Sequence, residues 1–103
     1  MRLRALLASA LLAPLALAAC SHGKPSKDDA LAPARTFVAQ QKYAEAILEY
    51  RTALAGDAHD GKIRKLLAEA CEKNNDPNGA YREYINAADL LPDDLDLQIK
   101  AGS

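Results

Sequence analysis

The side chains of this chain that could do covalent or metal chemistry are few and scattered. Two thiols, Cys20 and Cys71, and two imidazoles, His22 and His59, occur in 103 residues. Neither histidine has a second ligand at the short spacing that zinc sites use, so we expect no metal site. Cys71 falls among apolar residues at helical spacing and is expected to be a small buried hydrophobe, with an intermolecular disulfide or a redox role as the alternative.

An acidic run near the end of the chain is the other candidate for chemistry. Asp93, Asp94 and Asp96 lack the central Gly and the terminal Glu of a calcium loop, so we expect them to cap a helix and face solvent. The chain also has no serine in a nucleophile elbow and no Gly-rich phosphate loop. We therefore predict that the chain is not an enzyme and that it needs no cofactor.

Cys20 is distinguished by the residues before it. Arg2 and Arg4 give a positive start, and an almost uninterrupted apolar stretch follows over 5–19. This stretch is shorter than the roughly 20 residues that a transmembrane helix needs. The pattern therefore favours a secretory signal peptide over residues 1–19.

The stretch ends Leu17-Ala18-Ala19-Cys20, which resembles a bacterial lipobox. In that family the thiol of the cysteine receives a diacylglyceryl group, the peptide is cut before it, and the new amine is acylated, with palmitate a typical acyl chain. The resemblance implies lipidation of Cys20 and anchoring in the bacterial envelope. Ser21 is compatible with export to the outer membrane, facing the periplasm. The alternative is a secreted protein whose Cys20 stays a thiol.

A polar tether and a slightly acidic remainder follow. Residues 20–30 are polar and contain Gly and Pro, which is typical of a flexible tether. Two of the 13 Lys and Arg lie before residue 20, so the rest of the chain carries 11 against 14 Asp and Glu, a net charge of −3. This balance argues against a nucleic-acid partner.

The remaining residues match themselves at a shift of 34. A period of this size is typical of stacked helix–turn–helix arrays, whose units bury their apolar faces against one another and present a surface. Tyrosines at helical spacing, Tyr43, Tyr50, Tyr81 and Tyr84, are expected to pack between helices. The identical pairs are Ala34/Ala68, Ala46/Ala80, Glu49/Glu83, Tyr50/Tyr84, Ala53/Ala87 and Asp60/Asp94.

The small–aromatic–small order of this repeat resembles the tetratricopeptide repeat (TPR) family, over about residues 30–103. Ala58, Cys71 and Pro77 depart from the family pattern, and a generic helical hairpin with chance self-similarity is the alternative. The resemblance implies an all-α, antiparallel helix–turn–helix TPR-like solenoid. Two repeats, 27–60 and 61–94, and a truncated third, 95–103, make up the domain 31–103. We expect helices at 31–41, 44–55, 61–74, 77–91 and from 94 onward, with Asp60, Asp76 and either Asp93 or Asp94 as N-caps.

In TPR arrays the first helix of each repeat lines a concave face that binds proteins. The resemblance therefore implies protein partners at such a face, and the alternative is ordinary solvated charges. The Lys/Asn/Arg clamp that some TPR domains use for a C-terminal carboxylate is absent, so we expect no chaperone-tail binding. The residues expected on this face are Lys62, Lys65, Glu69 and Glu72 of the second repeat and Arg35 of the first.

The third repeat is expected to be incomplete, because the chain stops at Ser103, just inside its first helix. We expect that this sequence belongs to a longer array. Leu95, Leu97 and Ile99 would then lack a covering helix, so self-association at this end is also expected.

Taken together, these patterns predict a lipid-anchored periplasmic scaffold or adaptor that mediates protein–protein interactions in envelope assembly or export. The stretch 83–102 most resembles the large TPR lipoproteins linked to exopolysaccharides and exosortases, which favours polysaccharide export and protein sorting. The alternative function is a non-catalytic regulatory subunit of cell-wall synthesis or hydrolysis enzymes. An array fused to a catalytic domain beyond Ser103 is a further possibility.

Overall fold

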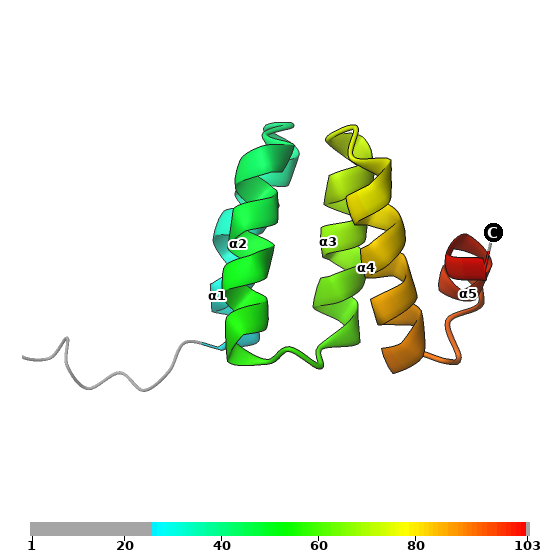
Figure 1. The fold of residues 1–103 in the computed structure, drawn as a ribbon. Helices are drawn as coiled ribbons and strands as arrows, with labels where there is room; N and C mark the ends of the chain where they lie inside the picture. The colour runs from blue at the N-terminus through cyan, green and yellow to red at the C-terminus, as the bar shows by residue number, and fades with distance from the viewer. Residues whose placement is uncertain (1–25, 103) are drawn as a thin grey trace, which may run out of the picture.

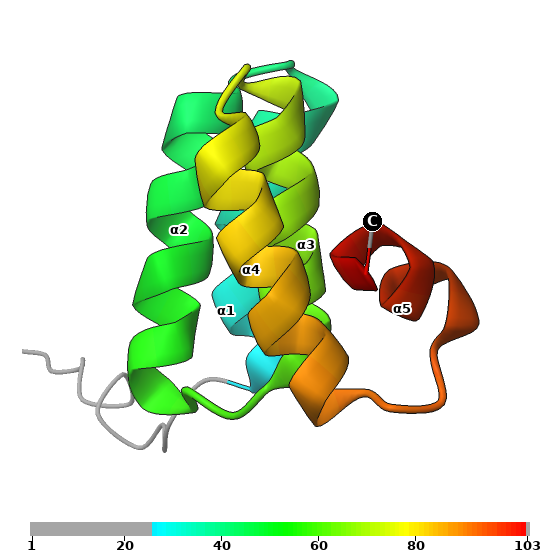
Figure 2. The same cartoon turned by 45° about the vertical axis from the view of Figure 1, so that its right-hand side comes forward.

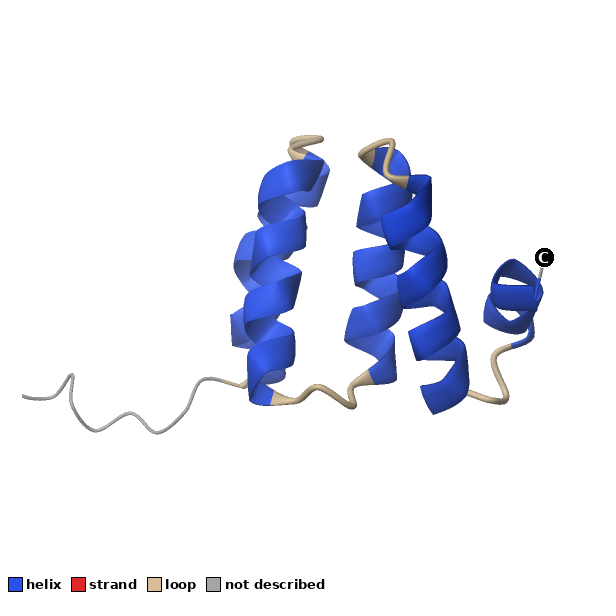
Figure 3. Cartoon of the chain, viewed as in Figure 1, coloured by secondary structure: helices blue, strands red, loops and turns tan. Residues whose placement is uncertain are grey.

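The protein is all-α over residues 26–102, the range that its computed structural model describes, and no strand occurs there (Figure 3). The predicted signal peptide, Cys20 and most of the tether lie outside this range. The predicted all-α class is confirmed. The helices are α1 (Lys27–Ala39), α2 (Tyr43–Gly56), α3 (Gly61–Lys73), α4 (Pro77–Leu90) and α5 (Leu95–Gly102).

The helices form two antiparallel hairpins, followed by α5. Helices α1 and α2 pair in the first hairpin, α3 and α4 in the second, and α2 also packs against α3. Helix α5 packs against α4 on the far side of the second hairpin (Figures 1 and 2). Each helix therefore rests on the one before it in the chain.

The backbone repeats with the same period as the sequence. The turn inside each hairpin recurs, because Gln41 and Asn75 both adopt a left-handed conformation with φ of 60°. The helix starts recur at the same shift of 34, from Lys27 to Gly61 to Leu95 for α1, α3 and α5, and from Tyr43 to Pro77 for α2 and α4. We call residues 27–60 the first unit and residues 61–94 the second unit.

The first helix of each unit, and α5, begins with a side-chain cap. Ser26, Asp60 and Asp94 each accept a hydrogen bond from the amide three residues along, at 3.0–3.1 Å. Such caps satisfy backbone donors that a helix start leaves unpaired. The predicted capping of α4 is also found, with Asp76 accepting from the amide of Gly79 and Pro77 in the first turn.

Small residues lie where the helices cross. Alanine at a crossing lets two helix axes approach closely, and larger side chains one turn away fill the space beside it. Leu67, Cys71 and Leu97 are the largest side chains that are completely buried. Of the six repeated alanines, Ala53 is half-buried and the others are buried, namely Ala34, Ala46, Ala68, Ala80 and Ala87.

The first helix begins earlier than predicted. Helix α1 starts at Lys27 rather than at residue 31, so residues 27–30 belong to the helix and not to the tether. The N-cap hydrogen bond of Ser26 and the acidic first turn of α1 stabilise this start. As a consequence, Pro33 lies inside the helix rather than in its first turn.

Two further expectations were wrong at single residues. Tyr81 does not pack between helices, because its side chain faces solvent and is 49% exposed. Leu97 is not left uncovered in α5. It is fully buried, because it takes the place that Ile63 has in α3. Leu95 and Ile99 are exposed as expected.

Lysines of one helix hold the cap of the next first helix. In the first unit, Lys27 donates to Asp60 at 2.8 Å and to Asp57 at 3.1 Å. In the second unit, Lys65 donates to Asp94 at 2.7 Å. These contacts raise the pKa of both lysines and lower the pKa of Asp57 and Asp94. Each N-cap carboxylate is therefore also tied to the unit before it by a lysine.

None of the helices between residues 26 and 102 combines the length and the apolar character that crossing a membrane requires.

Candidate partner-binding surface

The residues predicted to bind a partner lie on α1 and α3, but two of them are engaged within the protein. Lys65 is paired with Asp94, and Glu72 accepts a hydrogen bond from the hydroxyl of Tyr84 at 2.7 Å. Both contacts link α3 to neighbouring elements of the fold. Lys65 and Glu72 are therefore less available to a partner than their sequence positions indicated.

The other predicted residues stay accessible. Lys62 is exposed and Glu69 is half-buried, both on α3. Arg35 on α1 is exposed and lies 3.4 Å from Asp28, one of the weak pairs of the surface. Whether these residues bind a partner stays a prediction.

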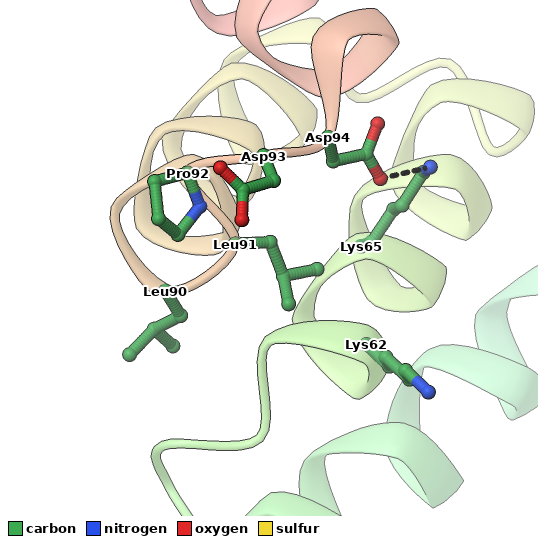
Figure 4. A pocket seen from close by; sticks show the side chains of 7 residues that line it. All are labelled: Lys62, Lys65, Leu90, Leu91, Pro92, Asp93 and Asp94. Carbon is green, nitrogen blue, oxygen red and sulfur yellow. Dashed lines mark hydrogen bonds and ion pairs between the residues drawn. The ribbon is translucent and has the colours of Figure 1, made fainter.

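A broad depression lies where α3 begins. It has a volume of about 640 Å³ and combines the first turn of α3 with the turn between α4 and α5. Figure 4 shows the ion pair of Lys65 and Asp94 on one side, with the side chain of Lys62 extending away from it. The lining residues are Lys62, Lys65, Leu90, Leu91, Pro92, Asp93 and Asp94.

A smaller notch lies between α1 and α3, with the start of α2 beside it. Its volume is about 70 Å³, and Tyr50, which is only 3% exposed, forms part of its lining. At the edge of the notch, the ammonium group of Lys73 lies over the ring of Tyr43, 5.9 Å from the ring centroid. The remaining lining residues are Val38, Leu66, Glu69 and Ala70.

The tyrosine at the equivalent place in the second unit makes polar contacts. Tyr84, the counterpart of Tyr50 in this unit, donates its hydroxyl hydrogen to Glu72. Lys100 lies over its ring, 5.1 Å from the centroid. Burial, followed by the hydrogen bond to Glu72, raises the pKa of Tyr84, so the hydroxyl remains a donor.

A third hollow lies where the first unit meets α3, away from the notch. It has a volume of about 550 Å³ and lies between the start of α1, the end of α2 and Ile63 of α3. Ala30 and Gly56 leave this space open because they are small, and the second unit has the larger Arg64 and Leu90 at the same positions. The other lining residues are Ser26, Lys27, Thr52, Ala53 and Asp57.

Arg64 fills part of the corresponding place in the second unit, where a smaller pocket of about 290 Å³ remains, lined in part by Arg64, Asn86 and Leu90. Its guanidinium donates to Glu83 at 2.9 Å and to the carbonyl of Ala58 at 3.1 Å. The side chains of Arg64 and Glu83 are 22% and 10% exposed. The pair therefore occupies part of the space with a largely buried, hydrogen-bonded contact.

Comparison of the chain with models of known protein families gave no match, and comparison with curated proteins gave no significant one. The surface has to be interpreted from its own residues.

Sequence reasoning did not identify the notch or the hollow. Both arise because the two units differ at positions that their common backbone makes equivalent. The pairs Val38/Glu72 and Ala30/Arg64 would have indicated them, had the two units been compared position by position for what differs. The predicted residues instead came from the helical phase, which places them opposite the apolar stripe, and from the family resemblance.

The arrangement suits non-covalent binding. Cys71 is fully buried, and burial raises the pKa of its thiol, so it is a poor nucleophile. Over residues 26–102, no three His, Cys, Asp or Glu side chains come together in a way that could hold a metal ion. What the surface offers is a mixed set of charges around a small apolar notch on α1 and α3. We call this the α1–α3 face, defined by Arg35, Val38, Leu66, Glu69 and Lys73.

Proposed function

We propose that this protein is a lipid-anchored scaffold of the TPR-like solenoid type, which binds a protein partner through the α1–α3 face in the bacterial envelope. The observation that supports it most is the helical hairpin that recurs at a shift of 34 in residue number. This is the period of the TPR family, whose stacked hairpins act as binding surfaces. Polysaccharide export and the associated protein sorting are the favoured setting, with the outer membrane as the site of anchoring.

The make-up of the α1–α3 face supports the proposal. The face carries both signs of charge, from Arg35, Glu69 and Lys73, beside the apolar side chains of Val38 and Leu66. Partner-binding surfaces combine an apolar centre with a polar rim in this way. Binding to such a face alters where a partner is held and needs no chemistry from the scaffold itself.

Site-specific photo-crosslinking tests the face. A photoreactive amino acid is placed at Arg35 or Lys73, and as matched controls at Leu48 of α2 or Arg82 of α4, which are also exposed. Crosslinks formed in intact membranes are identified by mass spectrometry. We expect one envelope-assembly protein to be captured from positions 35 and 73 and not from positions 48 and 82. Equal capture from all four positions, or none, would contradict the proposal.

The identity of the captured protein decides between settings. An enzyme of cell-wall synthesis or hydrolysis would support the regulatory-subunit function instead of the scaffold in an export system. The position of the crosslink on that enzyme then gives the surface that the α1–α3 face covers.

The anchor is tested separately. Cys20→Ala should abolish incorporation of labelled palmitate and leave residues 1–19 attached, which mass spectrometry detects as a heavier chain. Cys71→Ala is the matched thiol control and should change neither result. Palmitate incorporation that persists without Cys20 would refute lipidation at that residue.

A further inference from the structure

Tyr50 and Tyr84 occupy the same position in the two units, yet their hydroxyl groups differ. Tyr84 donates to Glu72. Tyr50 is 3% exposed, and no group within residues 26–102 forms a hydrogen bond with its hydroxyl. Buried polar groups almost always have a partner, so an orphan hydroxyl calls for an explanation.

The difference follows from two substitutions between the units. The position of Glu72 is held by Val38 in the first unit, and the position of Lys100 is held by Leu66. Both replacements are apolar and line the notch next to Tyr50. The first unit therefore presents a small apolar recess with one unsatisfied hydrogen-bonding group.

The size of the recess limits what enters it. Its volume is about 70 Å³, and one water molecule in the liquid occupies roughly 30 Å³. The notch thus has room for two or three non-hydrogen atoms of a small side chain. A threonine side chain has this size. Its methyl group suits the walls made by Val38 and Leu66, and its oxygen suits the hydroxyl of Tyr50.

Two charged side chains also line the edge of the notch. Glu69 and Lys73 both line it, one helical turn apart on α3. Burial, and then the charge of Glu69, raise the pKa of Tyr50 against an opposing effect of Arg35. The hydroxyl is therefore protonated at neutral pH and can donate a hydrogen bond.

We infer that the notch binds the threonine side chain of an extended segment of the protein partner, with the hydroxyl of Tyr50 donating to the threonine oxygen. A basic residue beside that threonine pairs with Glu69, and an acidic one pairs with Lys73. The inference rests on the proposed function, because it requires a partner on the α1–α3 face. It names the residue type that this face selects.

A double-mutant cycle with isosteric pairs tests the inference. The probes are the capped peptide Ac-Ala-Lys-Thr-Glu-Ala-NH2 and its analogue with valine in place of threonine. Each is titrated into the full chain in detergent micelles, and the methyl resonances of Val38 and Leu66 report binding by NMR. We expect the threonine peptide to bind about three- to tenfold more tightly than the valine peptide, the range for one neutral hydrogen bond.

The preference should vanish in Tyr50→Phe and persist in Tyr84→Phe, whose hydroxyl is already bonded to Glu72. Melting temperatures of both variants establish that they are folded. Equal affinity for the two peptides, a preference that survives in Tyr50→Phe, or no shift at Val38 and Leu66 would each overturn the inference. The proposed function is read independently, from the crosslinks at positions 35 and 73.

Discussion

The two units share one backbone and differ in what fills it. The second unit places larger or charged side chains at the positions around both recesses. Arg64 and Leu90 reduce one recess to a pocket of about 290 Å³, and Glu72 and Lys100 contact Tyr84 in the other. The first unit leaves the equivalent places open, as the hollow and the notch. The residues that the two units have in common place the helices. The residues that differ between the units determine which recesses stay open to a binding partner.

The first helices of the two units, α1 and α3, also differ on one face. Ile63, Leu67 and Ala70 are buried in α3. The same positions in α1 are Asp29, Pro33 and Thr36, all exposed. Helix α1 therefore exposes polar and small side chains at positions where α3 buries apolar ones.

The largest effect is expected at one of these pairs of positions. Leu67→Ala removes a side chain that is 1% exposed, so it should destabilise the protein by about 2–5 kcal/mol. Pro33→Ala at the equivalent position should instead stabilise it by about 1–3 kcal/mol, because it restores a backbone donor inside α1. Urea unfolding of the full chain in micelles measures both. Loss of stability in both variants would show that the two faces are alike.

The ion pair of Arg64 and Glu83 in the second unit should give the next largest effect. Arg64→Ala leaves Glu83 largely buried without its main partner, at a cost of about 2 kcal/mol. Glu49 stands at the position of Glu83 in the first unit, where Ala30 offers no counterpart to Arg64. Glu49→Ala should therefore change stability by less than about 0.5 kcal/mol. Thermal unfolding measures both losses. Equal losses in the two variants would show that the ion pair of Arg64 and Glu83 adds no stability of its own.

Two glycines offer a third contrast, of smaller size. Gly56 faces the hollow, and an added Cβ there meets no atom within 4 Å. Gly56→Ala should stabilise the protein by up to about 1 kcal/mol. At Gly61 an added Cβ would lie 2.7 Å from Cγ of Leu91 and 2.9 Å from Cβ of Leu90, so Gly61→Ala should cost about 1–3 kcal/mol. A destabilised Gly56→Ala, with Gly61→Ala as the comparison in the same melts, would mean that the hollow is not open space.

The sequence was sufficient for the shared features of the two units. Alanines at the crossings, the caps Asp60 and Asp76 and the all-helical class were predicted, because they depend on local patterns that the period repeats. The start of α1 was missed, since Ser26 lies in a polar stretch that was interpreted as a tether. Ser26 lies 34 residues before the N-cap Asp60. This spacing was the signal that could have given the correct start of α1.

The binding surface was less predictable from the sequence, for a physical reason. Lys65 and Glu72 have the charge and spacing of groove residues, but their partners lie in other parts of the fold. Asp94 belongs to the turn before α5, and Tyr84 belongs to α4. Such contacts depend on how α4 and α5 sit against α3, which no local pattern encodes. The notch at Tyr50 is likewise a product of three helices.

The smallest effect concerns the lysines that link the units, and it depends on pH. Lys27 holds two carboxylates in the first unit, Asp57 and Asp60, whereas Lys65 holds one, Asp94. Burial acts to raise the pKa of Asp60, but the hydrogen bonds from Lys27 and from backbone amides outweigh it and lower the pKa. The contact with a lysine is the main cause that lowers the pKa of Asp57 and Asp94.

Because these pKa values are lower in the folded state, the unfolded chain binds more protons in acid. The carboxylates therefore contribute stability above the unfolded pKa of about 3.9, and that contribution is lost as the pH falls through the lower folded values. Lys27→Met should reduce the fall in melting temperature between pH 5 and pH 2.5 more than Lys65→Met does, since it releases two acids rather than one. Both effects should be small, because the pairs are partly exposed and screened by salt. Melting curves of Lys27→Met that follow the wild-type pH dependence would mean that the first link is a surface contact without energetic weight, and that the capping amides alone hold Asp60 ionised.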